Sequence, residues 1–331
     1  MAGAFTHFMV CREALKSTTS AIKRLVQGLR PNLYVGAVSP DIPYLAVAQE
    51  VSSLSCADYM HYKRTNGIAS AAVQALYGSS IAYRGKAAWL LGYVSHLVAD
   101  ATIHPIVQEI VGPYEYNKAE HMRCEMVQDA FVFREFTGRE IRDSGFIGGY
   151  MVPINNRVLY FWRDLFYRTY FPQFGEDRKT RPSDSARSPK KTTCDIDGRR
   201  FRIEFLENSI RPGRWLRWYR TLLNSSTTGK FRNLTRHIGI GKSLSYPTTE
   251  EILRDYPAEH EIFFEKVKLP FRKNRAHFMS AGFVRTVRNV LRSWEVTWEG
   301  IREGKAITHY IKDWNLDTGR DQLTGKVTFW M

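Results

Sequence analysis

Two imidazoles and a carboxylate recur at four-residue steps in the apolar stretch GYVSHLVADATIHPIVQ, residues 92–108. His96, Asp100 and His104 would share one face of a helix, because helical neighbours lie three and four residues apart. A polar group without a partner in apolar surroundings costs on the order of a few kcal/mol. The pattern therefore predicts that hydrogen bonds, a catalytic network or a metal ion compensates these side chains.

The stretch EHMRCEMVQDAF, residues 120–131, repeats this spacing with His121, Glu125 and Asp129. One pair of His and carboxylate four residues apart is more often a surface ion pair. Two such pairs with a third histidine in register are typical of helical metal sites, in which ligands project from facing helices. Imidazole and carboxylate without thiolate favour Zn²⁺ in a hydrolytic role over Mn²⁺ or Fe.

The four cysteines, Cys11, Cys56, Cys124 and Cys194, are scattered and form no CxxC pair. This pattern predicts free thiols in a cytosolic protein, and no thiolate ligand. Cys124 lies between two predicted ligands, but we expect it to pack in the core.

The composition limits the class of protein. A chain of 331 residues with 44% hydrophobic content can bury a full core, in about one to three domains. No apolar run approaches the roughly 20 residues that cross a bilayer, so no transmembrane segment is expected. The start, MAGAFTHFMVCREALK, lacks the pattern of a secretory signal, which predicts a cytoplasmic location. The net charge of +15 lies mostly after residue 175 and favours partners that carry phosphate, such as nucleic acid or an anionic membrane surface with the protein bound at its periphery.

Helices must position the candidate ligands, because apolar residues recur at helical spacing through most of the first half. This spacing covers residues 8–29, 67–80, 84–111, 118–138 and 155–171. Gly28 and Gly138 are expected to end two of the helices. Residues 33–46, LYVGAVSPDIPYLA, contain Pro and Gly and predict a loop that presents Asp41.

The composition changes at residues 174–193, which are charged and rich in Ser and Pro and predict a linker or exposed loop. Alternation around Asp-Gly predicts a short hairpin in residues 194–208. Basic, aromatic-rich helices are expected at 213–225 and 283–304, and a strand in the tail at 317–331. The chain is therefore expected to be mainly α with three parts: a helical domain at residues 1–173, the linker at 174–193, and a basic, aromatic-rich mixed α/β region at 194–331.

Five blocks resemble, in this order, the zinc-dependent phospholipase C family: THFMVCREAL, GAVSPDIPYL, MHYKRTNG, GYVSHLVADATIHP and EHMRCEMVQDAF. They lie within residues 4–135. That superfamily also includes the fungal-type zinc nucleases and the N-terminal domain of glycosylphosphatidylinositol-specific phospholipase D. The resemblance implies a helical phospholipase C-like domain that holds up to three zinc ions.

The resemblance also implies a ligand set of histidines and carboxylates: His61, His96, Asp100 and Asp41 for one ion, His104, His121 and Glu125 for a second, and His7 for a third. Asp100 would bridge to the third ion, and Asp41 would be a ligand or the general base. The four-residue step from Asp100 to His104 resembles the phospholipase D branch, since the secreted enzymes and fungal nucleases have six. That branch has Asp where this chain has Glu125.

Three carboxylates have more than one interpretation at this point. Asp41 would orient or deprotonate the attacking water, or is a turn residue beside Pro43. Asp58, three residues before His61, would compete for the role of base, support a ligand from behind, or cap a helix. Asp129 would support an imidazole through a hydrogen bond, or is a surface charge.

The third zinc site raises a question about the N-terminus. Secreted members of the family complete this site with the amine and carbonyl of a processed N-terminal Trp, and no Trp precedes His7. Met1 is followed by Ala2, a small residue that permits removal of the initiator Met. We therefore hypothesise that the Ala2 amine fills this role. A protein that retains Met1 and still binds three zinc ions would contradict the hypothesis.

The expected function is zinc-dependent phosphodiester hydrolysis of the phospholipase C kind, with a phospholipid headgroup as the favoured substrate and C-type or D-type cleavage left open. Bound zinc would lower the pKa of a water towards neutrality. The alternatives are a zinc nuclease on the same scaffold and a binding module with a structural metal site. The stretches RWLRWYR and SWEVTW fit base stacking or a membrane interface, although core packing explains most of their Trp residues.

Overall fold

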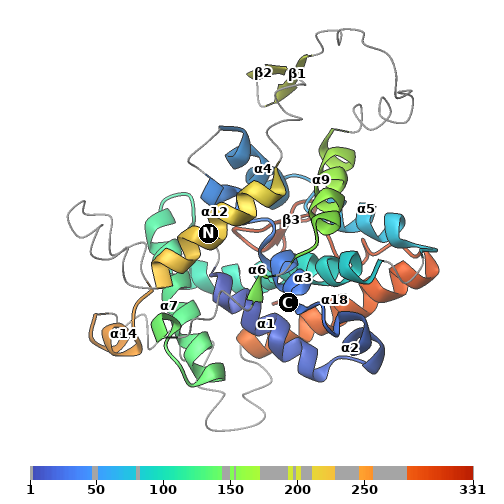
Figure 1. The fold of residues 1–331 in the computed structure, drawn as a ribbon. Helices are drawn as coiled ribbons and strands as arrows, with labels where there is room; N and C mark the ends of the chain where they lie inside the picture. The colour runs from blue at the N-terminus through green and yellow to red at the C-terminus, as the bar shows by residue number, and fades with distance from the viewer. Residues whose placement is uncertain are drawn as a thin grey trace.

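The structure is a computed structural model that describes residues 3–46, 51–79, 83–143, 150–152, 154–171, 193–196, 199–202, 211–227, 246–255 and 282–330. The protein is mainly helical, as predicted (Figure 1). The first half contains α1 (Ala4–Ser17), α2 (Ser20–Val26), α3 (Arg30–Val38), the 3₁₀ helix η1 (Ile42–Ala46), α4 (Val51–Tyr62), α5 (Gly67–Leu76), α6 (Arg84–Val111), α7 (Lys118–Thr137), the 3₁₀ helix η3 (Ile141–Asp143) and α9 (Asn156–Tyr170). The second half contains β1 (Thr193–Ile196), β2 (Arg199–Arg202), α12 (Pro212–Thr227), α14 (Thr249–Asp255), α18 (Gly282–Glu303), β3 (Trp314–Asn315) and β4 (Arg320–Asp321).

Helix α6 is the central element, and its range agrees with the prediction. It packs chiefly against α3 and α18, and every residue from Ala87 to His104 is buried. Within the described part of the chain, α6 is the one helix long and apolar enough to cross a membrane, and 94% of that apolar window is buried inside the protein. Its apolar composition therefore reflects a core helix.

Two glycines let α3 and α6 approach closely. A Cβ at Gly92 would lie 1.9 Å from the Leu33 carbonyl oxygen, and a Cβ at Gly36 would lie 2.0 Å from that of Trp89. Such distances exclude any side chain, so the backbones of the two helices touch at this crossing. The backbone of α3 thereby comes within reach of side chains on α6.

The predicted loop at residues 33–46 is wrong for most of its length. Helix α3 covers Arg30–Val38, and η1 follows at Ile42–Ala46. Pro31 lies in the first turn of α3, where a missing N–H costs nothing, so it starts the helix instead of interrupting it. Asp41 does lie in a turn, between α3 and η1.

The predicted helix at residues 8–29 is divided in two. Helix α1 ends at Ser17, and α2 begins after Thr19, whose hydroxyl accepts a hydrogen bond from the Ile22 amide at 3.4 Å. Hydroxyl caps of this kind start a new helix where apolar spacing alone would continue the old one. Gly138 follows the end of α7, as predicted, and has the left-handed conformation.

The C-terminal helix α18 shares the core of the first half. It packs on α6 and α1, and the Trp294 indole donates to the Leu91 carbonyl at 2.9 Å and to the Ser95 hydroxyl at 2.8 Å. Trp215 is also buried, which confirms core packing for both residues, whereas Trp218 is exposed. The predicted domain boundaries remain a prediction, and the linker lies outside the described residues except for Thr193.

The strands are short and lie in two separate sheets. β1 and β2 form an antiparallel hairpin in which Ile196 pairs with Arg199, as predicted around Asp-Gly. β3 pairs antiparallel with β4, so the tail does contain a strand. The first of these sheets is remote from the helical core in Figure 1.

Candidate metal centre

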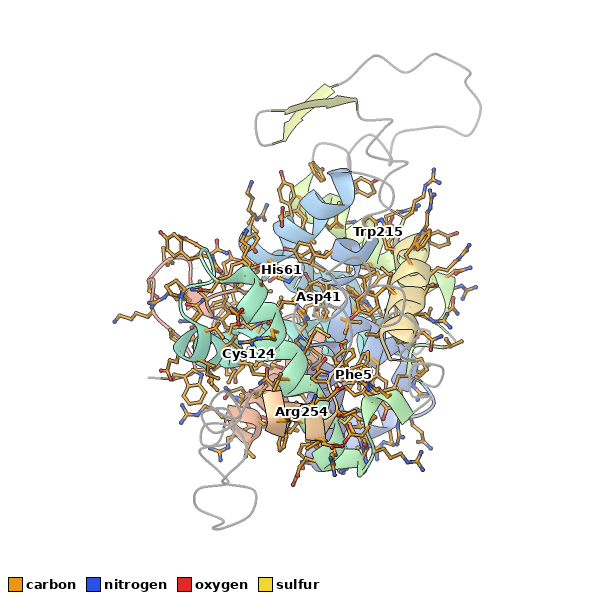
Figure 2. The ribbon with its side chains drawn as sticks, turned by 90° about the vertical axis from the view of Figure 1, so that its left-hand side faces the viewer. Phe5, Asp41, His61, Cys124, Trp215 and Arg254 are labelled. Atoms are coloured by element: carbon orange, nitrogen blue, oxygen red, sulfur yellow. The ribbon has the colours of Figure 1, made fainter. Side chains whose placement is uncertain are left out.

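The structure brings all eight predicted ligands into one buried cluster, and none of them is more than 3% exposed. They come from five places in the chain: His7 on α1, Asp41 in the turn before η1, His61 on α4, His96, Asp100 and His104 on α6, and His121 and Glu125 on α7. Figure 2 shows Asp41 and His61 close together in the interior. The cluster contains three groups that could hold an ion.

The first group consists of Asp41, His61 and His96. The Asp41 Oδ1 atom lies 3.1 Å from His61 Nε2 and 3.8 Å from His96 Nε2. Because His61 lies in the last turn of α4 and His96 lies on α6, the Asp41 turn joins the two helices at this point. Asp41 is thus placed as a member of the group, and its role as ligand or general base stays a prediction.

The second group consists of His104, His121 and Glu125, the set that the family resemblance implies for one ion. The Glu125 Oε1 atom lies 2.8 Å from His104 Nε2 and 3.0 Å from His121 Nε2. The pair on α7 is spaced by four residues, so both side chains point towards His104 on α6. This group therefore joins α6 to α7.

The third group consists of His7, His96 and Asp100. The Asp100 Oδ1 atom lies 3.2 Å from His7 Nε2, and its Oδ2 atom lies 3.1 Å from His96 Nε2. The rings of His7 and His96 stack with centroids 4.4 Å apart. Asp100 Oδ1 also lies 3.8 Å from His104 Nε2, so this carboxylate links the third group to the second, while His96 links it to the first.

Backbone carbonyls fix which nitrogen of three imidazoles faces the cluster. Nδ1 of His61 lies 2.8 Å from the Ala57 oxygen, Nδ1 of His96 lies 3.0 Å from the Ala37 oxygen, and Nδ1 of His104 bonds to the Leu316 carbonyl. A carbonyl can only accept, so each Nδ1 carries the hydrogen and donates it. In the neutral ring, Nε2 is then a bare acceptor that faces the cluster.

This arrangement fits a metal ion. The Nε2 lone pairs face carboxylate oxygens, which are also acceptors, and only protons or a cation can join them. The buried Asp41 Oδ2 and His7 Nδ1 atoms also have no hydrogen-bond partner. Five imidazoles and three carboxylates without a thiolate suit Zn²⁺. Each group offers three protein ligands, which leaves a coordination position for water or substrate.

The electrostatics of the cluster favour cations. Burial lowers the pKa of His104, but the charges of Asp100 and Glu125 outweigh burial and raise that pKa to about 10. Burial acts to raise the pKa of Asp100, yet His96, His104 and His7 hold it well below its usual range. Asp100 is therefore ionised, and His104 keeps its second proton wherever no metal ion replaces it.

Asp129 and Asp58 occupy places that the sequence did not predict. Asp129 is buried, so the surface alternative is wrong, and it accepts the amides of Phe5 at 3.1 Å and Thr6 at 2.6 Å. It thus caps the first turn of α1, next to His7, from 123 residues away. Asp58 lies inside α4, so it is not a helix cap; it is exposed and accepts a hydrogen bond from Tyr44 at 3.0 Å.

A cavity of about 230 Å³ opens onto the second group. Its lining combines predicted ligands with residues that the sequence did not single out: His61, His104, His121, Glu125, Tyr44, Tyr114 and Asp317. Tyr44 and Tyr114 carried the weak signal of aromatic residues beside predicted ligands. Asp317 had none, because it reaches the site only through long-range packing of the C-terminal segment.

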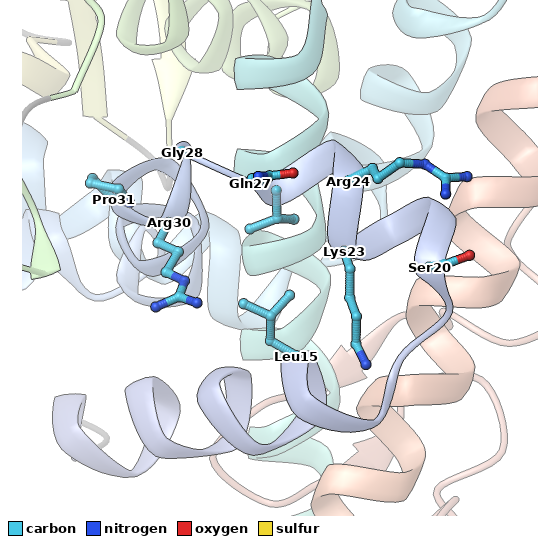
Figure 3. A pocket seen from close by; sticks show the side chains of 9 residues that line it. Leu15, Ser20, Lys23, Arg24, Gln27, Gly28, Arg30 and Pro31 are labelled. Atoms are coloured by element: carbon cyan, nitrogen blue, oxygen red, sulfur yellow. The ribbon is translucent and has the colours of Figure 1, made fainter.

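The larger cavity lies elsewhere. Figure 3 shows this space of about 790 Å³ between the end of α1, α2 and the start of α3. Its charged lining residues, Lys23, Arg24 and Arg30, are all basic. Because none of them can serve as a zinc ligand at neutral pH, the smaller cavity is the one that belongs to the metal cluster.

The remaining predictions concern the cysteines and the Ala2 amine. Cys11 and Cys56 are buried free thiols, and Cys124 packs against Ala99, Ile103 and Val107, as expected for core residues. No cysteine belongs to the three candidate ion groups of the described residues. The Ala2 amine lies outside the described residues.

Comparison with known proteins gives one match. A family model described as zinc dependent phospholipase C matches residues 6–173. The matched segment contains all eight predicted ligands and ends far before Leu316 and Asp317. No curated protein and no solved structure matches the chain.

Proposed function

Since the chain belongs to the zinc dependent phospholipase C family, we propose that it hydrolyses a phosphodiester bond of a phospholipid headgroup by C-type cleavage. The observation that carries this proposal is the chain of three ion groups, linked through His96 and Asp100, beside a cavity of about 230 Å³. Two metal ions held about 3.5–4 Å apart are the arrangement that many hydrolytic enzymes use on phosphate esters.

The residues of the cluster and of the cavity would have different roles in the reaction. Zinc bound by these groups would supply a Lewis acid for the phosphate oxygens and a water that loses its proton near neutral pH. Asp41 Oδ1 lies 3.1 Å from His61 Nε2 and faces the first ion group, which leaves the buried Oδ2 atom to accept the proton of the attacking water. Tyr44 and Tyr114 line the cavity and would orient the headgroup.

The burial of two tryptophans favours phospholipid over nucleic acid as the substrate. Base stacking needs exposed aromatic faces, and Trp215 and Trp294 are core residues instead. The net charge of +15 still suits a membrane surface with anionic lipids. We therefore propose contact with such a surface from the cytoplasmic side.

The first experiment measures zinc and products together. The purified protein is analysed for zinc per chain and is then incubated with phosphatidylcholine, phosphatidylinositol or single-stranded DNA. We expect bound zinc and release of diacylglycerol. Phosphatidic acid as the product would mean D-type cleavage, cleavage of DNA alone would mean a nuclease, and fewer than one zinc per chain would overturn the proposal.

Matched variants connect the activity to the cluster. Asp100→Ala removes the carboxylate that links two groups and should lower activity by ~100-fold or more together with zinc content. Glu109→Ala, two turns further along α6 and exposed, removes an equal charge outside the cluster. It should keep the zinc content and activity of the wild type.

A further inference from the structure

We propose that the C-terminal strap, Asp313–Gly319, is an integral part of the metal centre: its Leu316 carbonyl positions His104, and its Asp317 closes a wall of the cavity. The strap lies outside the matched residues 6–173. The proposal rests on the zinc-binding part of the proposed function and is independent of the substrate.

One edge of the strap is bonded to the end of α4 and the turn that follows. The Leu316 amide donates to the carbonyl of His61 at 3.0 Å, so the strap holds the backbone of a predicted ligand. Thr65 and Trp314 exchange two hydrogen bonds, at 2.8 and 3.1 Å. The Tyr62 hydroxyl donates to the Asp317 carboxylate. Trp314 is fully buried here, so the strap is anchored in the core.

The other edge is bonded to α6. His104 Nδ1 donates to the Leu316 carbonyl, and one turn later the Gln108 side chain donates to the Asp317 carbonyl at 2.7 Å. A single residue, Leu316, thus bonds to His61 through its N–H and to His104 through its C=O. The strap ties together two helices that each supply ligands.

Gly319 makes the close fit on α6 possible. It has φ +65°, and a Cβ there would lie 2.7 Å from the Ala101 carbonyl oxygen and 2.6 Å from Pro105 Cγ. Any side chain at this position must push the strap away from the α6 turn that carries His104. Gly325 has nearly the same φ, +67°, but nothing lies within 4 Å of its added Cβ.

The Leu316 carbonyl affects metal binding through the Nδ1–H group of His104. A partner for Nδ1–H fixes the tautomer and ring orientation of a zinc-ligating histidine, and loss of such a partner typically lowers metal affinity by roughly 10–100-fold. In His61 and His96 the partner carbonyl comes from within the matched segment, at Ala57 and Ala37. In His104 alone of these three it comes from the strap.

The test compares Gly319→Ala with Gly325→Ala, because both place a side chain at the same unfavourable φ and only the first clashes with α6. Zinc affinity and stoichiometry are measured in each full-length variant, and the His104 Nδ1–H is followed by ¹⁵N NMR in the zinc-free protein. We expect Gly319→Ala to bind the ion at His104, His121 and Glu125 about 10–100-fold more weakly and to lose the hydrogen-bonded Nδ1–H signal. Gly325→Ala should behave like the wild type.

Equal zinc affinity in the two glycine variants would overturn the proposal. If Gly319→Ala does not fold, Gln108→Ala gives the answer, because it removes one partly buried bond to the strap; unchanged zinc affinity in this variant also overturns the role. If the wild type binds zinc but releases no lipid product, the proposed function is contradicted and the proposal on the strap is unaffected. A wild type that binds no zinc overturns both.

Discussion

At the scale of single residues, the two ring nitrogens of three histidines have different partners, and the cluster depends on this difference. Three histidines donate through Nδ1 to backbone carbonyls, which directs Nε2 to the cluster. The residue types and the four-residue spacing on α6 and α7 were enough to predict His96, Asp100, His104, His121 and Glu125 as candidate ligands. His7, Asp41 and His61 were predicted only from the resemblance to a known family. The carbonyl partners were not predictable, because any residue supplies a carbonyl and its position depends on the packing of distant segments.

Asp129 shows how a residue that is no ligand holds one in place. It accepts the Phe5 and Thr6 amides at the start of α1 and the Tyr246 hydroxyl at 3.0 Å. Burial raises its pKa to about 6, against an ordinary value of 3.8, although these hydrogen bonds act to lower it. His7 follows directly after the capped turn, so this buried carboxyl sets the position of a predicted ligand.

The pH dependence of stability should report on Asp129. Its pKa is higher in the folded than in the unfolded protein, so its contribution to stability is greatest below about pH 4 and is lost as the pH rises through about 6. Between pH 4.5 and 7 the free energy of unfolding of the wild type should fall by about 1 to 3 kcal/mol relative to Asp129→Asn, which cannot titrate.

Urea unfolding of both proteins at the two pH values measures this difference. If the free energy of unfolding changed with pH in the same way in both proteins, the pKa of Asp129 would not be raised in the folded state. Its hydrogen bonds would then offset the effect of burial on that pKa.

At the scale of elements, the crossing of α3 and α6 determines whether the cluster can form. The close approach of the two helices at Gly36, which faces Trp89, and at Gly92, which faces Leu33, brings the Ala37 carbonyl to His96. The long apolar helix α6 was predictable from the spacing of its residues. Helix α3 was not, because its Pro and Gly suggested a loop, and only the close contact with α6 explains why a helix needs Gly36.

Substitution at this crossing should damage both stability and metal binding. Gly92→Ala places a Cβ 1.9 Å from the Leu33 oxygen, and such overpacking should lower the free energy of unfolding by about 1–3 kcal/mol or more. Zinc affinity should fall with it, because the Ala37 carbonyl moves away from His96. Chemical denaturation and zinc titration give the two values.

Gly213→Ala is the matched control on another helix. Its Cβ would lie 3.4 Å from Leu159 Cδ1, an ordinary contact, in the first turn of α12. Its stability should stay within about 1 kcal/mol of the wild type, with a gain from helix propensity. Equal losses in both variants would mean that the α3–α6 crossing has no special role.

At the scale of the whole molecule, the metal cluster joins helices from the start of the chain to its C-terminal strap. Helix α18 packs on α1 and α6, and one hydrophobic core contains residues from Ala4 to Leu316. Composition predicted a basic second half but did not reveal that part of it completes the core. Pairings of this sequence separation carry no local signal, so neither Leu316 nor Asp317 was among the predicted site residues.

Removal of zinc should therefore destabilise the entire fold. Without the ion, only protons can join the imidazole Nε2 atoms to the carboxylate oxygens of the cluster. Binding of the ion to the folded state adds about 4 kcal/mol at a thousandfold excess over Kd. We expect a chelator to lower the Tm by about 5–15 °C and added Zn²⁺, but not Mg²⁺, to restore it. Calorimetry with and without chelator measures the shift, and an unchanged Tm would contradict a link between metal binding and folding.

The strap also has a consequence for how the protein acquires its metal during synthesis. His104 precedes its partner Leu316 by 212 residues, and at roughly 5–20 residues per second the ribosome needs about 10–40 s to make that stretch. Until then, the nascent chain carries an incomplete ligand environment. Tight metal loading is thus deferred until the chain segment that closes the centre has emerged from the ribosome.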